Sequence, residues 1–572
     1  MNRKYHLLTA LFAMTTFANI YGQNTKGIRA EYSELAKKTP LPVIRSNRND
    51  IFTVHNNKKT PWIITPSIKP DILESYSKDV YFVTDIDTLH ISVEEGGKYD
   101  FVILNANNDS AFTRVQWVAN NPLENTPKEL GTLSPTGKLS RQQAIYDIDA
   151  LAYTISETHP DMFAVTGHEK LMQKLLDIEN QVTDSIDIAN LYKMLMPWVT
   201  SIGDAHTGLQ YPVNSIFTQE LRRFPVIVKV TDDYKIIVKA CHNDLIPIDA
   251  EITSINGICA KDMLTQMMQY VSGERDFYKL NRISDDFLAY FHLLFTKDNY
   301  EIEYKLKGEK KPKTITVPSI SFEDSKQLRL GYNKRNAIAT SNKDNYSFQI
   351  LQDKSTAIMD FKSFWNVDKM KFFADSMFTT LKEQGIKNLI IDIRENGGGN
   401  SLVGDELLRY ISPKPFCQFA KTYVRITPTS RRMMQGNNIT PGISFYNNNQ
   451  LTESYYGTDK YYDGNVILLT SHHTFSSANS FAWAFKYFGC GTIIGEETGG
   501  MNVSFGDILM YTLPISNLKC SISFKRFWLY GADEKDIHGT LPDISVAQED
   551  ALDTAFKVIN KGKKNKKVIQ PR

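Results

Sequence analysis

The hydrophobic pattern in the last third of the chain alternates between short, continuous apolar runs and longer amphipathic segments. Apolar runs begin directly after Asn388 and at Val466, and runs of this length are typical of strands buried in a parallel sheet. Apolar residues recur at helical spacing over 370–383 and 478–488, and Gly489 stands where the second helix would end. This alternation predicts a layered α/β core.

The rest of the chain shows other patterns. Short segments between residues 80 and 104 alternate or are rich in β-branched residues, which predicts a small antiparallel β domain. Apolar residues then recur at helical intervals over 140–199, with a break at Pro160. Residues 224–317 carry strand patterns again, and the Asn/Gly/Tyr-rich stretch 428–457 is expected to be a long loop. The fold class predicted is a multidomain α+β protein.

Two of the predicted strands end in turns suited to catalysis. The strand from Asn388 runs into three glycines in NLIIDIRENGGGNS, where the backbone can approach a ligand closely. The strand from Val466 ends at Ser476 and Ser477, where amides at a helix start can face developing negative charge. A serine there is a nucleophile or an N-cap, and by position alone the cap is commoner. The glycine turn lacks the phosphate-loop patterns, so together the two turns favour acyl transfer.

Four motifs follow one another over about 355–551: DIRENGGGNS, TFSSANSFA, GEETGG and HGTLPDI. In this order they resemble the tail-specific (C-terminal-processing) serine peptidases, whose core has the ClpP/crotonase-type fold. The resemblance implies that Ser477, which precedes Ala478, is the nucleophile, rather than Ser476 or Ser480. It also implies hydrolysis of peptide bonds through an acyl-enzyme, without a metal or cofactor.

A histidine is the predicted general base. His206 lies in SIGDAHTG, a glycine-flanked turn after the helical segment. GDAHT resembles the GDGHT motif of the family branch that includes the tricorn protease core, in which histidine takes the proton. The other branch uses a Ser–Lys dyad, and its lysine would fall where this chain has Met501 and Asn502. A lone histidine more often has a structural role, so the motif carries this assignment.

Three other histidines are rivals for this role: His472, His473 and His538. The first two precede the serine turn, and we expect them to face solvent or to pack at the strand end. The third belongs to HGTLPDI and would line the rim of the cleft. The resemblance favours His206 over all three.

The oxyanion hole implied by the resemblance consists of backbone amides. One donor would be Ala478, the residue after the nucleophile, and the other Gly397 or Gly398. These amides would stabilise the negative charge of the tetrahedral intermediate.

The acid that orients the imidazole is less well defined. In the tricorn-like pattern a serine precedes the histidine and a glutamate lies shortly before GxxPD, but this chain has Ala205 and Asp536 there. Asp536 is the predicted acid, acting directly or through a water. Participation of Asp204, or another means of holding the ring, remains an alternative.

The segment PIDAEITSINGICAKDML resembles the middle of a PDZ domain, a module that binds extended peptides by strand addition. The resemblance implies that a polypeptide substrate docks its C-terminus there, although 271–297 looks like an insertion and a generic β module is the alternative.

The predicted divisions are a signal peptide (1–22), an N-terminal β domain (23–124), a linker (125–139), a helical segment with GDAHT (140–210), a PDZ-like module (220–320), a ClpP/crotonase-like core (340–556) and a basic tail (557–572).

The net charge and the N-terminal residues bear on the partners of the protein and on its location. The chain has 66 basic and 64 acidic residues, and a net charge of +2 argues against nucleic-acid binding. Asn2, Arg3 and Lys4 precede a short apolar stretch, which predicts a signal peptide and export to the periplasm or the extracellular space. No later run approaches ~20 apolar residues, so we expect no stable membrane span. The five cysteines show no CxxC spacing, and we expect no structural metal site.

The function expected from the sequence is that of an exported serine endopeptidase. One alternative is a carrier of hydrophobic ligands or peptides, because retinoid-binding relatives have this fold. The intact Ser477, His206 and glycine turn favour the enzyme. A crotonase-type acyl-CoA enzyme shares the oxyanion chemistry, but a signal peptide argues against it.

Overall fold

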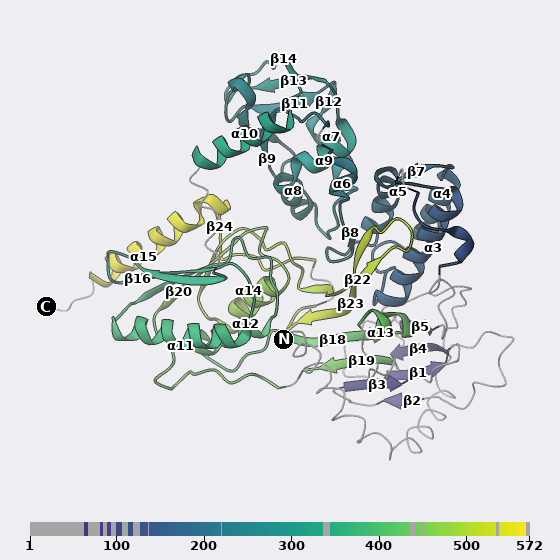
Figure 1. Cartoon of the computed structure of the whole chain (residues 1–572). Helices are drawn as coiled ribbons and strands as arrows, with labels where there is room; N and C mark the ends of the chain where they lie inside the picture. Colours follow the sequence, from purple (N-terminus) through teal and green to yellow (C-terminus); the bar gives the residue numbers. More distant parts are fainter. Residues whose placement is uncertain are drawn as a thin grey trace. The chain divides into compact units, whose positions relative to one another are not determined.

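The computed structural model describes strands at 62–66, 81–83, 88–92, 99–105 and 113–117, and then residues 126–134, 137–218, 220–335, 344–434, 442–448, 450–533 and 537–567 (Figure 1). The chain forms two compact units. The first comprises residues 1–210, 422–447 and 507–526, and the second comprises 211–421, 448–506 and 527–572. Each unit is considered by itself below.

The four motifs lie in the second unit, on a six-stranded sheet of order β15-β16-β17-β20-β21-β24. The edge strand β15 is antiparallel to β16, and all other neighbours are parallel. The strands are β15 (Tyr346–Ile350), β16 (Thr356–Phe361), β17 (Asn388–Asp392), β20 (Asn465–Thr470), β21 (Thr492–Gly495) and β24 (Ile544–Ser545).

Helices cover both faces of this sheet: α11 (Val367–Glu383), α12 (Leu402–Ile411), α14 (Ser477–Phe488) and α15 (Ala551–Lys567). The first three pack on one face together with Leu389 and Ile391 of β17. Ile390 points to the opposite face and packs against α15. The apolar runs are continuous because both faces of these strands are buried.

A second sheet in this unit forms a β module, with β9 at its edge in the order β14-β13-β11-β10-β9. Its strands are β9 (Val226–Val230), β10 (Ile236–Cys241), β11 (Glu251–Ile255), β12 (Ile258–Cys259), β13 (Asn299–Lys305) and β14 (Lys313–Pro318), and its helices are α6 (Val213–Ile216), α7 (Ala260–Met268), α8 (Asp276–Asp285), α9 (Phe287–Phe295) and α10 (Phe322–Arg335). The segment 271–297 forms α8 and α9, whose apolar side chains join the core of this module.

The first unit contains the helices α3 (Arg141–Thr158), α4 (His168–Gln181), α5 (Ile188–Thr200) and α13 (Pro428–Met433). A small pair of strands, β6 (Lys138–Leu139) and β7 (Ile186–Asp187), flanks the helices. Two larger sheets have the orders β2-β1-β4-β5 and β22-β23-β18-β19-β3, with β8 added to β23, and one end of β18, of β22 and of β23 belongs to the second unit. Their strands are β1 (Trp62–Pro66), β2 (Tyr81–Val83), β3 (Thr88–Ser92), β4 (Tyr99–Asn105), β5 (Thr113–Trp117), β8 (Gly208–Leu209), β18 (Phe419–Ile426), β19 (Gly442–Asn447), β22 (Val503–Thr512) and β23 (Lys519–Leu529).

The predicted fold class is confirmed: the chain is a multidomain protein of mixed helices and sheets with an α/β core, and the core strands and helices lie where the hydrophobic pattern placed them. The loop predicted over 428–457 is wrong, because α13 and β19 lie inside it. β19 pairs with β3, a distant partner that no local pattern reveals. The predicted signal peptide, 1–22, lies outside the described residues. In the part that the structure describes, no helix is long and apolar enough to cross a membrane.

Candidate active site

The two turns singled out in the sequence are neighbours at the carboxyl ends of two adjacent strands of the core sheet. β17 and β20 are adjacent and parallel, with Asp392 opposite Leu469, so both strands end on the same side. The glycine turn (396–400) follows β17, and the serine turn (471–477) follows β20 and leads into α14. Parallel pairing therefore accounts for the meeting of two motifs that are far apart in the chain.

Close packing explains why the glycine turn requires glycine. Gly398 has φ +98°, and a Cβ there would lie 2.7 Å from Phe475 O and 2.8 Å from Ser477 N. Gly399 has φ +140°, and its Cβ would lie 2.4 Å from Phe364 O. By contrast, a Cβ at Gly397 would meet nothing within 4 Å. The second and third glycines are thus fixed by sterics and by backbone conformation, and the first is not.

Asn396, which is fully buried, joins the two turns. Its Nδ2 donates to Phe361 O at 2.7 Å, and its Oδ1 accepts from the Gly398 amide at 2.9 Å. Its backbone carbonyl accepts from the Phe475 amide at 3.1 Å. One residue thereby connects β16, the glycine turn and the serine turn.

Ser476 and Ser477 stand at the start of α14 with an unusual backbone. Ser476 has φ 54° and ψ −124°, a region that residues with a Cβ rarely occupy, and its side chain makes no capping bond. Such a conformation costs roughly 1–3 kcal/mol. The hydroxyl of Ser477 donates to Gly399 O at 2.7 Å, so this side chain is not the cap of the helix either. The geometry disfavours the N-cap interpretation of both serines.

The candidate oxyanion donors differ in their present bonding. The Gly398 amide donates to Asn396 Oδ1, and the Ala478 amide donates to Phe475 O at 3.1 Å. Within the described part of the chain, the exposed Gly397 amide has no acceptor. Gly397 therefore offers a donor that needs no rearrangement.

The remaining two motifs meet at Asn479 in the first turn of α14. Its Oδ1 accepts from Thr498 Oγ1 at 2.6 Å, from Thr540 Oγ1 at 2.8 Å and from Thr540 N at 3.2 Å. Its Nδ2 donates to Met501 O at 3.0 Å. GEETGG and HGTLPDI are thus bonded directly to the helix that begins at Ser477.

The rival histidines each have polar partners within the second unit. His472 is largely buried, with Nε2 2.8 Å from Asp232 Oδ2. Burial lowers its pKa, but the bond to Asp232 and the charge of Glu496 outweigh this, so the pKa is raised. His473 contacts Asn281 and Asp285, and His538 Nδ1 lies 3.2 Å from Glu497 Oε1. Of the two placements expected for His472, it therefore packs at the end of the strand and does not face solvent.

His206 lies in the first unit, in the loop between α5 and β8. Its loop is organised by Asp204, a fully buried carboxylate. Oδ1 accepts from the His206 amide at 2.9 Å and lies 3.8 Å from His206 Nδ1. The hydroxyl of Ser521 holds the carbonyl of His206 at 2.8 Å, which ties the loop to β23.

The other oxygen of Asp204 has three partners, at 2.5 Å from Thr207 Oγ1, 2.7 Å from Ser523 Oγ and 3.2 Å from His159 Nε2. Burial alone would raise the pKa of Asp204, but the hydrogen bond from His159 and the nearby imidazole of His206 hold it well below its usual value. His159 Nδ1 accepts from the Asp161 amide at 3.1 Å, so Nε2 carries the proton that faces Asp204. Asp204 is therefore an ionised anchor of the GDAHTG loop.

The structure brings together the predicted Ser477, Ala478, Gly397 and Gly398 within the second unit. His206 is described within the first unit, and Asp536 lies outside the described residues. Sequence reasoning missed Asn396, Asn479 and His159. The first two stand inside the quoted motifs, and His159 stands in ETHPDMF just before Pro160, so their positions were visible but their partners were not.

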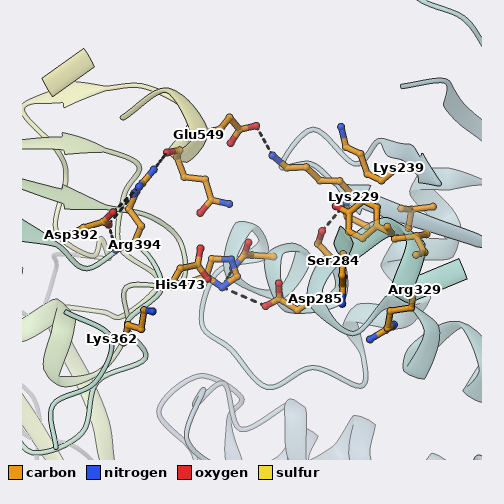
Figure 2. A pocket seen from close by; sticks show the side chains of 18 of the residues that line it. Lys229, Lys239, Ser284, Asp285, Arg329, Lys362, Asp392, Arg394, His473 and Glu549 are labelled. Atoms are coloured by element: carbon orange, nitrogen blue, oxygen red, sulfur yellow. Dashed lines mark hydrogen bonds and ion pairs between the residues drawn. The ribbon is translucent and has the colours of Figure 1, made fainter. Parts of the chain in front are cut away.

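A cavity of about 700 Å³ lies in the second unit between the β module and the core (Figure 2). The module side is lined by 227–230 of the edge strand β9 and by Asp285 of α8, and the core side by Arg394 and His473. His473 belongs to the serine turn, and Arg394 precedes the glycine turn. The cavity therefore connects an open strand edge to the residues next to the site.

Most charges around this cavity are paired. Figure 2 shows Lys229 meeting Glu549, at 2.7 Å, and His473 meeting Asp285, at 3.4 Å. Arg394 contacts Asp392 at 2.6 Å. The lining thus has no strong excess of either sign. In the described residues no group of three or more His, Cys, Asp or Glu side chains is placed to hold a metal ion.

Comparison with known proteins shows a family match over one part of the chain and solved structures with a similar fold. The model of Peptidase family S41 matches residues 355–546. The crystal structure of mature CPAF is similar at 13% identity, over 72% of this chain and 94% of that chain, with a TM-score of 0.52. Mature CPAF complexed with lactacystin is similar at 13% identity, over 74% and 98%, with a TM-score of 0.51. The photosystem II D1 C-terminal processing protease matches at 14% identity over 72% and 93%, with a TM-score of only 0.35.

Proposed function

We propose that this chain, which matches the model of Peptidase family S41 over residues 355–546, is an exported serine endopeptidase in which Ser477 is the nucleophile and His206 the general base. The observation that carries the proposal is the packing of the Ser477 turn against a glycine turn with an exposed amide. A nucleophile beside backbone donors is the arrangement that acyl transfer needs.

The reaction would proceed in two halves. The imidazole of His206 removes the hydroxyl proton of Ser477 as the oxygen attacks the peptide carbonyl. The same ring then gives that proton to the leaving amine, which leaves an ester on Ser477. Water, deprotonated by the ring, hydrolyses the ester and restores the serine.

Two local changes prepare the site for this chemistry. The Ser477 hydroxyl leaves its bond to Gly399 O and turns toward the base. The Ala478 amide gives up Phe475 O and joins the Gly397 amide in bonding the oxyanion. Both changes exchange one hydrogen bond for another, so each costs little.

The orienting acid is proposed to be Asp536, with Asp204 in a supporting role. The carboxylate of Asp204 already accepts hydrogen bonds from four donors, including the His206 amide. Its 3.8 Å separation from Nδ1 of the ring is too long for a hydrogen bond. Asp204 therefore fixes the loop that presents the ring, and a second acceptor is needed to hold the imidazolium.

The substrate is a polypeptide, and we propose that part of it, such as its C-terminus, docks in the cavity of Figure 2. The edge strand β9 can accept an extended segment by strand addition. The basic and apolar N-terminal stretch of the sequence supports export, so the substrates would be periplasmic or extracellular polypeptides.

The proposal is tested by removing each reacting group in turn. Ser477→Ala should abolish hydrolysis of a peptide substrate while the melting temperature stays close to that of the wild type. Ser476→Ala is the matched control, and it should keep measurable activity. An inactive Ser476→Ala beside an active Ser477→Ala would reassign the nucleophile to the neighbouring position.

The base and the acid are tested through kcat and KM. kcat/KM should rise with pH as the imidazole loses its proton, and His206→Ala should remove this rise and most of the rate. Asp536→Asn should lower kcat by orders of magnitude with little change in KM. Full activity in His206→Ala would exclude histidine as the base, and an unchanged kcat in Asp536→Asn would exclude this acid.

A further inference from the structure

We infer that Gln418 is a positioning residue that holds the two sides of the oxyanion hole in register, an inference that rests on the proposed function. Gln418 is buried, with 3% of its surface exposed, and it directly precedes β18. None of the sequence motifs contains it. Its amide group nevertheless bonds to the helices that follow both turns of the site.

The nitrogen of the Gln418 side chain holds the helix behind the glycine turn. Nε2 donates to Ser401 O at 2.7 Å and to Asp405 Oδ1 at 2.8 Å. Ser401 is the residue before α12, and Asp405 lies in its first turn. Both amide protons are therefore used to fix the start of α12, directly after the glycine turn.

The oxygen of the same side chain holds the helix that begins at the nucleophile. Gln418 Oε1 accepts from Ser480 Oγ at 2.6 Å, and Ser480 Oγ also lies 3.0 Å from Ser477 O. Two acceptors on one side and a hydroxyl on the other define which atom is nitrogen and which is oxygen. Rotation of the amide by 180° would set its oxygen against the carbonyl of Ser401 and the carboxyl of Asp405.

The contact with Ser480 reaches the oxyanion donor through a rigid unit. Ser477 O and the Ala478 N–H belong to one planar peptide group. Ser480, held by Gln418, also contacts Ser477 O and so limits how far the peptide that carries the Ala478 N–H can move. The same Gln418 fixes α12, which begins where the glycine turn ends, so one side chain sets the two backbone segments that carry the donors.

The backbone around Gln418 is held just as firmly. Its carbonyl accepts from the Tyr530 amide at 3.0 Å, and Tyr530 O accepts from Trp483 Nε1 at 2.9 Å. Gly404 of α12 comes so close to Phe481 that a Cβ would lie 3.0 Å from its ring. Gln418 thus bonds to both α12 and α14 from a backbone that is itself held in place, so a shift of one helix strains its contact with the other.

The experiment compares Gln418→Met, Ser480→Ala and the double variant with the wild-type chain. A positioning role predicts that kcat falls about 10- to 100-fold with KM within about twofold, because a small misplacement near the reacting atoms has this effect. The rate of acylation by a fluorophosphonate should fall in parallel. The double variant should be no worse than Gln418→Met, because both changes break the same contact.

Ser412→Ala is the matched control, since it removes a buried hydroxyl that donates to Lys414 O at the other end of α12. It should leave kcat unchanged. If Gln418→Met and Ser480→Ala lower the melting temperature but keep the wild-type kcat, Gln418 is only structural and the inference is overturned. Ser477→Ala, assayed in parallel, distinguishes a failure of the inference about Gln418 from a failure of the proposed function. Activity in that variant would overturn the proposed function itself.

Discussion

Gly398→Ala is the substitution whose effect can be worked out most fully from the structure. The new methyl group would lie 2.7 Å from Phe475 O, 2.8 Å from Ser477 N and 2.9 Å from Ser476 Cβ. Ordinary contacts begin near 3.4 Å, so the glycine turn and the serine turn must separate by roughly 0.6 Å. The residue must also keep φ +98°, which alanine adopts only at a cost of roughly 1–3 kcal/mol.

The expected consequences are separate for stability and for catalysis. Backbone strain and overpacking together should cost about 3 kcal/mol, which lowers the melting temperature by roughly 6–12 °C. A displacement of about half an ångström between the nucleophile and the glycine turn should lower kcat by roughly 10- to 100-fold. Both quantities are measurable on the purified variant, by thermal unfolding and by steady-state hydrolysis of a peptide substrate.

Gly397→Ala is the matched comparison for stability, because the same methyl group one residue earlier meets nothing within 4 Å. Its melting temperature should stay within about 2 °C of the wild type. Equal destabilisation of the two variants, or a Gly398→Ala enzyme with wild-type kcat, would refute the close packing of the two turns as the reason for glycine.

Two further predictions concern the polar anchors of the site. Asp204 has its pKa well below the usual 3.8, since the hydrogen bond from His159 and the nearby imidazole of His206 outweigh its burial. Its contribution to stability is complete above about pH 4 and is lost as the pH falls through the depressed value. The urea midpoint should therefore fall in acid more steeply for the wild type than for Asp204→Asn, and identical acid profiles would contradict this. Asn479→Ala leaves several buried groups of GEETGG and HGTLPDI without a partner and should cost about 3 kcal/mol or more together with most of kcat, whereas Asn465→Ala, at an exposed strand start, should change neither the melting temperature nor kcat measurably.

The core elements could be predicted from the sequence because their signals are local. The apolar runs after Asn388 and from Val466 form β17 and β20, since both faces of these strands are buried. Gly489 ends α14 in a left-handed conformation, φ 75°, which glycine adopts without strain. The glycines at 398 and 399 were also visible as a turn, although which of the three is sterically required was not.

The missed features depend on partners that are distant in sequence. β19 forms because β3 supplies its hydrogen bonds, so the composition of 428–457 alone suggested a loop. Asn396 and Asn479 are ordinary asparagines until the fold places several donors and acceptors around them. His159 contacts the GDAHTG loop through the buried carboxylate of Asp204, a contact that the sequence does not reveal. A motif identifies the residues near the reaction, but the polar contacts that hold them require the folded chain.

The central claim is that Ser477 is the nucleophile, and its most direct test is covalent labelling of the full chain by a fluorophosphonate, with the modified residue located by fragmentation of the peptide that contains Ser476 and Ser477. The account predicts a single modification at Ser477, absent in Ser477→Ala and strongly slowed in His206→Ala. Modification at Ser476, or labelling that persists unchanged in Ser477→Ala, would contradict it.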